Sequence, residues 1–180
     1  MHERRFQAEI ERLRAPERLA RLEIDRVGHA SLEGLNAQSV LDVGTGSGVF
    51  AEAFAARGLA VSGVDVNPAM IAAAQGFVPA GQFHEAPAEA LPLPDHTVDV
   101  VFMGLVFHEV DDAAQALAEA RRVGRSRLMI LEWPYRAEEV GPPLAHRVPP
   151  ETILAQAQVA GCQQVETLPL NQLVLYRLSW

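Results

Sequence analysis

A run of alternating glycines constrains the fold of this chain most. Residues 40–50 read V-L-D-V-G-T-G-S-G-V-F, so that Gly44, Gly46 and Gly48 directly follow a short apolar run. Glycine has no Cβ atom and adopts positive φ readily, which suits a tight turn whose backbone approaches a ligand. The segment therefore predicts a buried strand, a sharp turn, and a helix whose first N–H groups lack partners inside the helix.

Strand and helix patterns alternate through the rest of the chain. Strands are predicted at 39–43, 60–64, 82–86, 98–103 and 127–132, and helices at 48–57, 68–75, 112–123 and 150–160. Two last strands, at 163–168 and 173–178, are separated by a short turn and predict a hairpin. The alternation predicts a Rossmann-like, doubly wound α/β fold with a mainly parallel sheet, to which the hairpin adds an antiparallel strand.

Composition and charge exclude several classes of protein. The 15 basic residues are outnumbered by 23 acidic ones, for a net charge of −8, which argues against nucleic acid as a partner. No apolar run approaches the length of a membrane span, and no signal-type apolar block follows the first residues. Cys162 is the only cysteine, so neither a disulfide within the chain nor a cysteine-based metal site is expected. We expect a cytoplasmic protein without a metal; a homodimer stays open.

The spacing of the glycines separates two kinds of nucleotide-like ligand. A dinucleotide site prefers G-x-G-x-x-G, whereas here the spacing is G-x-G-x-G and Val49 takes the position of the last glycine. Asp42 stands before the turn, where its carboxylate would repel a diphosphate and attract an amino group. Asp65 closes the second strand, where a carboxylate can accept both hydroxyls of an adenosine ribose. The residues favour an adenosine ligand with a cationic amino-acid tail, such as S-adenosylmethionine.

Three segments in a fixed order carry a family resemblance. They are V-L-D-V-G-T-G-S-G at 40–48, V-S-G-V-D-V-N-P-A-M at 61–70 and A-E-A-L-P-L-P-D-H-T-V-D-V-V-F at 88–102. Over residues 38–130 the chain resembles the class I S-adenosylmethionine-dependent methyltransferases, above all the branch of ubiquinone and menaquinone biosynthesis. The resemblance implies a seven-stranded sheet with an antiparallel last strand. It also implies S-adenosylmethionine as cofactor, S-adenosylhomocysteine as product and in-line methyl transfer to a small-molecule acceptor.

The resemblance also implies an organisation of the chain as one methyltransferase domain. Residues 1–36 would form an N-terminal helical lid of two helices separated at Pro16, and residues 37–132 the cofactor-binding core. Residues 133–149 would form a substrate loop, and residues 150–180 the C-terminal helix and hairpin.

The family's cofactor residues carry over to matching positions, which are Asp42, Gly44, Gly46, Gly48, Asp65, Val66, Met70, Ala88, Glu89, Met103 and Gly104. Asp42 and the three glycines of the turn would lie beside the methionine and ribose. Asp65 would bind the ribose diol. Val66 and Met70 would pack near the adenine, and Met103 and Gly104 would face the cofactor. The sequence departs from the family at Pro87, where an acid often binds the adenine amino group, because proline has no polar side chain. Either Ala88 with Glu89, or Glu85, takes over that contact, or adenine selectivity is weaker.

His108 is the candidate catalytic residue. It follows the fourth strand in G-L-V-F-H-E-V-D-D, where the family often carries two histidines beside the transferring methyl group. A sulfonium methyl is already electrophilic, so a base matters only when the acceptor must lose a proton. A histidine with an ordinary pKa near 6.5 suits that task. The structural alternative is that His108 caps the next helix or orients Asp112.

The segment 133–149 is expected to contact the substrate. It supplies Trp133, Tyr135, His146 and Arg147 between prolines that exclude a long helix. Tyr135, a second candidate catalytic residue, would orient a substrate hydroxyl, and Arg147 would clamp a carboxylate. The alternatives are that Trp133 belongs to the core and that Arg147 pairs with a surface acid.

Two other functions stay open from the sequence. A protein that binds S-adenosylmethionine without catalysis would share the cofactor residues, and Pro87 is compatible with it. An NAD-dependent oxidoreductase would need the dinucleotide spacing, against which Val49 and Asp42 argue.

Overall fold

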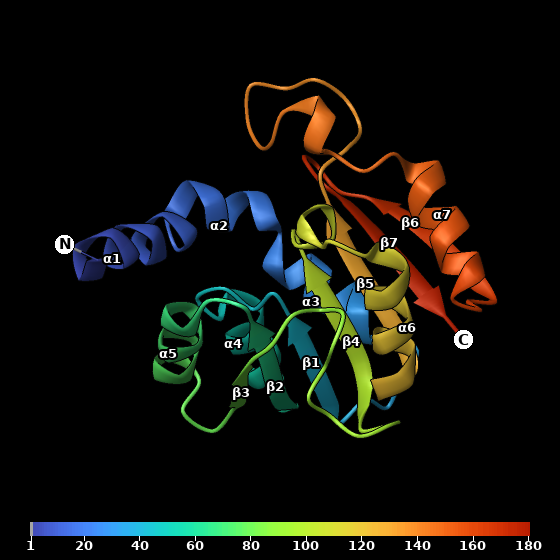
Figure 1. Cartoon of the computed structure of the whole chain (residues 1–180), viewed down its shortest axis with the longest axis horizontal. Coiled ribbons are helices and arrows are strands. Elements are labelled where there is room, and N and C mark those ends of the chain that lie inside the picture. The colour runs from blue at the N-terminus through green and yellow to red at the C-terminus, as the bar shows by residue number, and fades with distance from the viewer. Residues whose placement is uncertain (1) are drawn as a thin grey trace.

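Seven strands form one mixed sheet in the order β3-β2-β1-β4-β5-β7-β6 (Figure 1). A computed structural model describes residues 2–180 and the side chains from residue 8 onward. The strands are β1 Ser39–Val43, β2 Ala60–Asp65, β3 Gln82–Glu85, β4 Val98–Gly104, β5 Gly124–Glu132, β6 Gln164–Pro169 and β7 Val174–Ser179. The pairs among β1–β5 are parallel, whereas β7 runs antiparallel to both of its neighbours, β5 and β6, which confirms the predicted sheet and its terminal hairpin.

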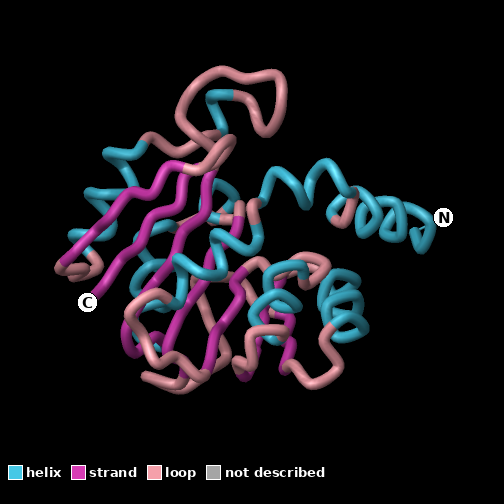
Figure 2. The backbone as a smooth tube through the Cα atoms, turned by 180° about the vertical axis from the view of Figure 1, so that it is seen from behind, coloured by secondary structure: helices cyan, strands magenta, loops and turns pink. Residues whose placement is uncertain are grey.

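Helices cover both faces of this sheet (Figure 2). They are α1 His2–Leu13, α2 Pro16–Leu22, α3 Ile24–Leu32, α4 Val49–Ala55, α5 Pro68–Phe77, α6 Ala113–Val123 and α7 Pro150–Val159. On one face, α6 and α7 bury Leu117 and Ile153 against the sheet. On the other face, α3 and α4 bury Val27 and Phe54. Because both faces are covered, the central strands β1 and β4 are mostly apolar and buried, as is typical of parallel sheets.

The N-terminal segment contains three helices where the sequence predicts two. The break at Pro16 is as expected, but Glu23 adopts a left-handed conformation with φ of 45° and separates α2 from α3. No pattern of apolar residues signals such a single-residue kink. No helix in the described residues is long and apolar enough to cross a membrane.

Side-chain caps fix the helices that border the carboxyl ends of the strands. The Asn67 side chain accepts a hydrogen bond from the backbone N–H of Ala69 at 3.0 Å and so begins α5. Asp112 does the same for α6, by accepting from Gln115 N at 3.0 Å. The strand order reverses between β1 and β4, and ligands of open α/β sheets bind at such a switch point.

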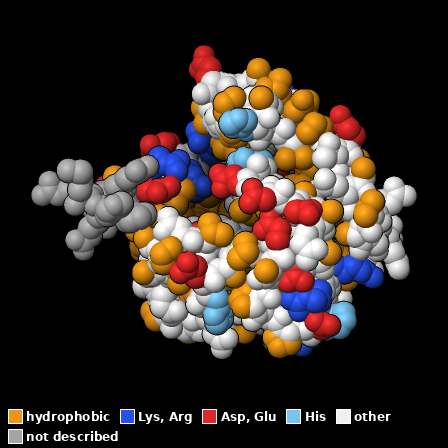
Figure 3. Space-filling view, in the orientation of Figure 1, with side chains coloured by type: hydrophobic (Ala, Val, Ile, Leu, Met, Phe, Trp, Pro, Cys, Tyr) orange, Lys and Arg blue, Asp and Glu red, His pale blue; other side chains and the backbone are white. Residues whose placement is uncertain are grey.

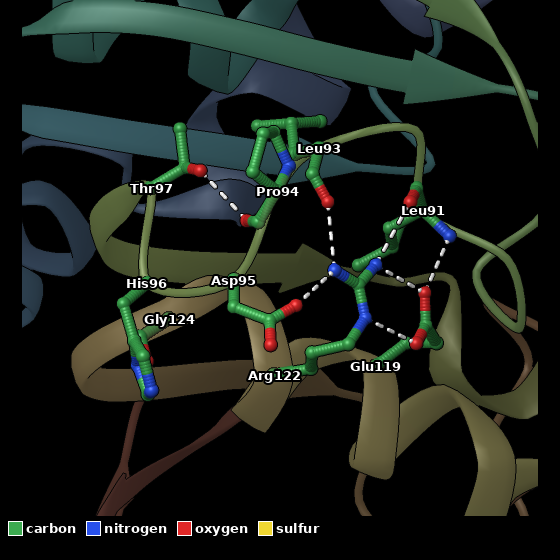
Figure 4. Close-up of polar contacts among 9 residues, drawn as sticks. All are labelled: Leu91, Leu93, Pro94, Asp95, His96, Thr97, Glu119, Arg122 and Gly124. Carbon is green, nitrogen blue, oxygen red and sulfur yellow. Dashed lines mark hydrogen bonds and ion pairs between the residues drawn. The ribbon is translucent and has the colours of Figure 1, made fainter.

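Arg122 fastens the proline-marked loop before β4 to α6 (Figure 4). Its guanidinium donates to the carbonyls of Leu91 at 2.9 Å and Leu93 at 2.7 Å. It also pairs with Asp95 at 2.9 Å and with Glu119 at 2.7 Å. Glu119 in turn accepts from the N–H of Leu91 at 2.8 Å. The loop that leads from residues 86–89 into β4 is therefore held in one position.

Candidate active-site cleft

A cleft of about 760 Å³ opens at the carboxyl ends of the strands. Figure 3 shows it as a hollow between the N-terminal helices and the body of the molecule. Its walls take residues from 9–18, 42–50, 65–70, 86–89, 104–111 and 133–142. The segments that the sequence predicts to hold a cofactor therefore surround one space. Among the described residues, no group of side chains is arranged to hold a metal ion.

The glycine turn has the backbone conformation that its sequence predicts. Gly44, Gly46 and Gly48 have φ of 66°, 53° and 77°. A Cβ atom on Gly44 would lie 2.4 Å from Cγ2 of Val106, and one on Gly48 would lie 3.0 Å from Cα of Ala74. At Gly46 the nearest atom would be 3.6 Å away. The turn thus needs glycine for its conformation at all three positions and for close packing at two of them.

Asp65 ties the glycine turn to the start of α5. Its Oδ2 accepts from the N–H of Gly46 at 2.9 Å, and its Oδ1 accepts from the N–H of Asn67 at 2.9 Å. A carboxylate oxygen has two acceptor sites, so each oxygen can take one more hydrogen bond from the cleft. The backbone therefore fixes the orientation of the carboxylate and leaves acceptor capacity on both of its oxygens.

Asp42 is buried beneath the same turn, and hydrogen bonds from the turn and from α4 hold its side chain. Its Oδ2 accepts from the Thr45 hydroxyl at 2.8 Å and from the N–H of Ala51 at 3.2 Å. Burial raises its pKa to about 7, the charge of Asp65 adds to the rise, and the two hydrogen bonds oppose it. A cation in the cleft would favour the ionised form of this group.

The raised pKa predicts how stability depends on pH. The folded chain holds a proton on Asp42 up to about pH 7, whereas an unfolded chain loses it near pH 4. The proton therefore stabilises the fold at pH 5, and this contribution is lost as the pH rises through 7. Relative to the Asp42→Asn variant, the free energy of unfolding should fall by about 2 kcal/mol between pH 5 and pH 8. Urea unfolding at both pH values measures this, and a constant difference between the two proteins would contradict it.

Most of the other predicted cofactor residues lie in the cleft wall. Val66 is 67% exposed and Met70 is buried, and both line the cleft, as do Ala88 and Gly104. Met103 differs, because its side chain is completely buried in the core and is not part of the wall. β4 continues as far as Gly104. Gly104 therefore lies in the cleft wall, whereas the side chain of Met103 lies in the core.

Glu89 lies in the wall but already has backbone partners. Its Oε1 accepts from the N–H groups of Asp111 at 2.8 Å and Asp112 at 3.1 Å. It therefore joins the 86–89 segment to the loop that follows β4. The predicted contact of Glu89 with an adenine would have to use its remaining acceptor sites.

His108 and Glu132 form a buried pair at the floor of the cleft. Nδ1 of His108 lies 2.9 Å and 3.0 Å from the two carboxylate oxygens of Glu132. Glu132 also accepts from the backbone N–H groups of His108 at 3.1 Å and Trp133 at 3.0 Å. The side chains are 9% and 1% exposed. Since Nδ1 must carry a proton to donate to the carboxylate, Nε2 is the acceptor nitrogen of the neutral ring.

This pair sets the pKa of His108. Burial alone would lower that pKa, but the hydrogen bond to Glu132 and the charges of Glu132 and Glu109 together outweigh it and raise the pKa above its usual value. Nε2 lies 3.7 Å from the carboxylate of Glu109. Glu132 was not among the predicted site residues, although it is an acid at the end of the apolar strand M-I-L-E. Neither structural alternative for His108 describes this pairing, because Asp112 itself caps α6.

The 133–149 segment brings few of its predicted residues to the cleft. Arg147 is buried, and its nitrogens donate to the carbonyls of Pro134, Val140 and Pro142 at 2.7–2.9 Å. It also forms an ion pair with Glu138 at 2.9 Å, which agrees with the alternative that Arg147 pairs with a surface acid. A substrate clamp at Arg147 does not agree with this geometry, since the loop itself occupies the guanidinium.

The aromatic side chains of this segment divide between cleft and solvent. Trp133 is partly buried, packs against the core and lines the cleft. Tyr135 is 46% exposed and His146 is exposed, and neither belongs to the residues that line the cleft. The structure therefore places Tyr135 and His146 outside the cleft wall, away from the substrate contacts predicted for them.

Comparison with known proteins relates the chain to one family. A model of the methyltransferase domain matches residues 41–128. Over 93 residues the chain is 38% identical to a demethylmenaquinone methyltransferase of Chlorobaculum parvum, a match that covers 51% of this chain and 39% of that protein. It is 35% identical over 94 residues to a malonyl-[acyl-carrier protein] O-methyltransferase of Serratia marcescens, with 52% and 37% covered.

A solved structure matches over a greater length. A SAM dependent methyltransferase of Aquifex aeolicus superposes with a TM-score of 0.82 at 25% identity, and the match covers 96% of this chain and 97% of that one. The matched part of the chain thus spans about two fifths of the length of the curated relatives and nearly all of this solved structure.

Proposed function

Because the chain belongs to the class I S-adenosylmethionine-dependent methyltransferases, related to the branch of quinone biosynthesis, we propose that it transfers a methyl group from this cofactor to a small-molecule acceptor in the cleft. The observation that carries the proposal is the glycine turn fastened to Asp65 at the carboxyl ends of β1 and β2. We propose that this reaction takes place in the cytoplasm.

The residues of the cleft fit the cofactor. Gly46 leaves the space that a side chain would fill above the turn, with Leu13 3.6 Å from where a Cβ would stand. Asp65 is oriented to accept the ribose hydroxyls, and the buried Asp42 carboxyl favours a cation beside the turn. When bound, the cofactor supplies an electrophilic methyl group on a sulfonium. The protein has to bind and align the two partners and exclude water.

His108 has the geometry of a base for acceptors that must lose a proton. Glu132 holds Nδ1–H, so the lone pair of Nε2 is left to accept a proton from an oxygen, a carbon acid or a protonated amine. The imidazolium that forms is stabilised by the same carboxylate and by Glu109. This arrangement supports catalysis over mere cofactor binding, since it gives a residue that lines the cleft a nitrogen able to accept a proton.

Ligand-induced stabilisation tests the proposed cofactor. S-Adenosylhomocysteine at about 100 times its dissociation constant should stabilise the fold by about 2.7 kcal/mol. This should raise the unfolding midpoint by about 5–10 °C, whereas NAD at the same concentration should leave it unchanged. Thermal-shift measurements decide between the two ligands, and a larger shift with NAD would favour an oxidoreductase. Turnover on a metabolite panel then separates an enzyme from a non-catalytic binding protein.

The Asp65→Ala variant tests the assignment of the ribose site. It should weaken binding of S-adenosylhomocysteine at least tenfold, or by about 1.4 kcal/mol, since the carboxylate both receives the diol and holds the glycine turn. Calorimetry measures the dissociation constant, and circular dichroism confirms the fold. The matched control is Asp95→Ala, which removes an exposed acid outside the cleft. An unchanged dissociation constant for Asp65→Ala would refute the ribose assignment.

A further inference from the structure

A second feature of the cleft is an arginine without an anionic partner. Arg18 lies in the first turn of α2, and its half-buried side chain lines the cleft. Its guanidinium donates through Nη1 to the carbonyl of Leu13 at 3.0 Å. Among the residues whose side chains the structure describes, no carboxylate forms an ion pair with it. Arg14 and Arg57, in contrast, pair with Glu52 and Asp25 at 2.8 Å each.

The surroundings oppose the charge of this guanidinium. Burial lowers the pKa of Arg18, and the nearby charges of Arg12 and Arg21 lower it further. Arg12 lines the cleft beside it, and its only ion pair among the described side chains is a long one of 3.8 Å to Glu9. A half-buried cation is costly unless an anion compensates it. Arg18 therefore carries a positive charge that no carboxylate among the described side chains pairs with, and an anionic ligand group would offset it.

The position of Arg18 limits which ligand group can reach it. Arg14 donates to the carbonyl of Ser47 at 2.9 Å, and Leu13 lies over Gly46. These contacts hold the junction of α1 and α2 above the glycine turn. Figure 3 shows basic side chains on this edge of the hollow and acidic side chains across from them. A ligand with a negative group near the turn would match this polarity.

We propose that Arg18 binds a carboxylate of a ligand in the cleft, supplied either by the amino-acid tail of the cofactor or by the acceptor. The inference rests on the proposed function. Nε and Nη2 of Arg18 make no hydrogen bond to the described residues, and together they form the planar fork that binds a carboxylate with two parallel hydrogen bonds.

Two nucleosides distinguish the tail of the cofactor from other sources. 5′-Methylthioadenosine shares the adenosine and the thioether of S-adenosylhomocysteine but lacks the amino-acid tail. If Arg18 binds that tail, Arg18→Gln should weaken binding of S-adenosylhomocysteine at least tenfold and leave 5′-methylthioadenosine within twofold, as measured by calorimetry. The matched control is Arg21→Gln, the same substitution at a residue that binds Gln172 at 2.8 Å outside the cleft. It should leave both ligands unchanged.

Benzoate tests the acceptor as the source. If Arg18→Gln leaves S-adenosylhomocysteine binding unchanged, benzoate titrated into the protein saturated with S-adenosylhomocysteine should bind the natural protein at least fivefold more tightly than the variant. The proposal is overturned if neither ligand depends on Arg18, or if the variant weakens both nucleosides equally. Failure of the natural protein to bind S-adenosylhomocysteine would instead contradict the proposed function.

Discussion

Replacing His108 by glutamine is expected to lower kcat by about 10²–10⁴, the usual contribution of a positioned base. Glutamine keeps a polar group that can donate to Glu132, but it has no nitrogen that accepts a proton at neutral pH. The rate is measured with an acceptor found in the metabolite panel, and the dissociation constant of S-adenosylhomocysteine serves as the control. We expect that constant to stay within twofold, since the loss concerns proton transfer. An unchanged kcat would show that alignment alone is sufficient.

The dependence of kcat/KM on pH tests whether His108 acts as a base. A base acts in its neutral form, so kcat/KM of the natural protein should rise with pH through the pKa of His108, which lies above the usual 6.5. In Glu132→Gln the hydrogen bond and charge that raise this pKa are lost while burial remains, so the midpoint should move to lower pH. NMR titration of the His108 ring measures the shift without any acceptor. A midpoint that stays in place would mean that Glu132 has only a structural role.

The parts of the molecule governed by local rules were predictable from its sequence. The glycine turn, the Asn67 cap and the strand-closing Asp65 follow from backbone conformations and cap chemistry that act over a few residues. The mainly parallel sheet follows from the alternation of apolar runs with helices, and the antiparallel last strand follows from the terminal hairpin. These elements position the cofactor side of the cleft.

The acceptor side depends on contacts that sequence spacing does not encode. Arg147 was predicted to bind a substrate carboxylate, but its guanidinium donates to carbonyls of its own loop. Glu132 was not predicted as a site residue, although it is the partner of His108, 24 residues away in the sequence. In both cases the folded path of the backbone decides whether a charged side chain turns inward to a partner or toward a ligand. Type and spacing of residues leave that choice open.

Gly44→Ala is expected to be the most damaging small substitution in the cofactor turn. The new methyl group would lie 2.4 Å from Val106, and the residue would have to keep a φ of 66°. A left-handed conformation costs a non-glycine residue about 1–2 kcal/mol, and overpacking adds about 1–3 kcal/mol. The free energy of unfolding should therefore fall by about 3 kcal/mol, with a loss of S-adenosylhomocysteine binding, as measured by urea unfolding and calorimetry.

Gly46→Ala separates the two causes, because its φ of 53° carries the same conformational cost while its methyl group would meet nothing closer than 3.6 Å. It should lose only about 1–2 kcal/mol. The double variant Gly44→Ala/Val106→Ala removes part of the clash and should recover stability relative to Gly44→Ala alone. If Gly44→Ala and Gly46→Ala cost the same, the approach of Val106 does not restrict the turn. The loop after β4 would then be mobile enough to give way, and so would the floor that carries His108.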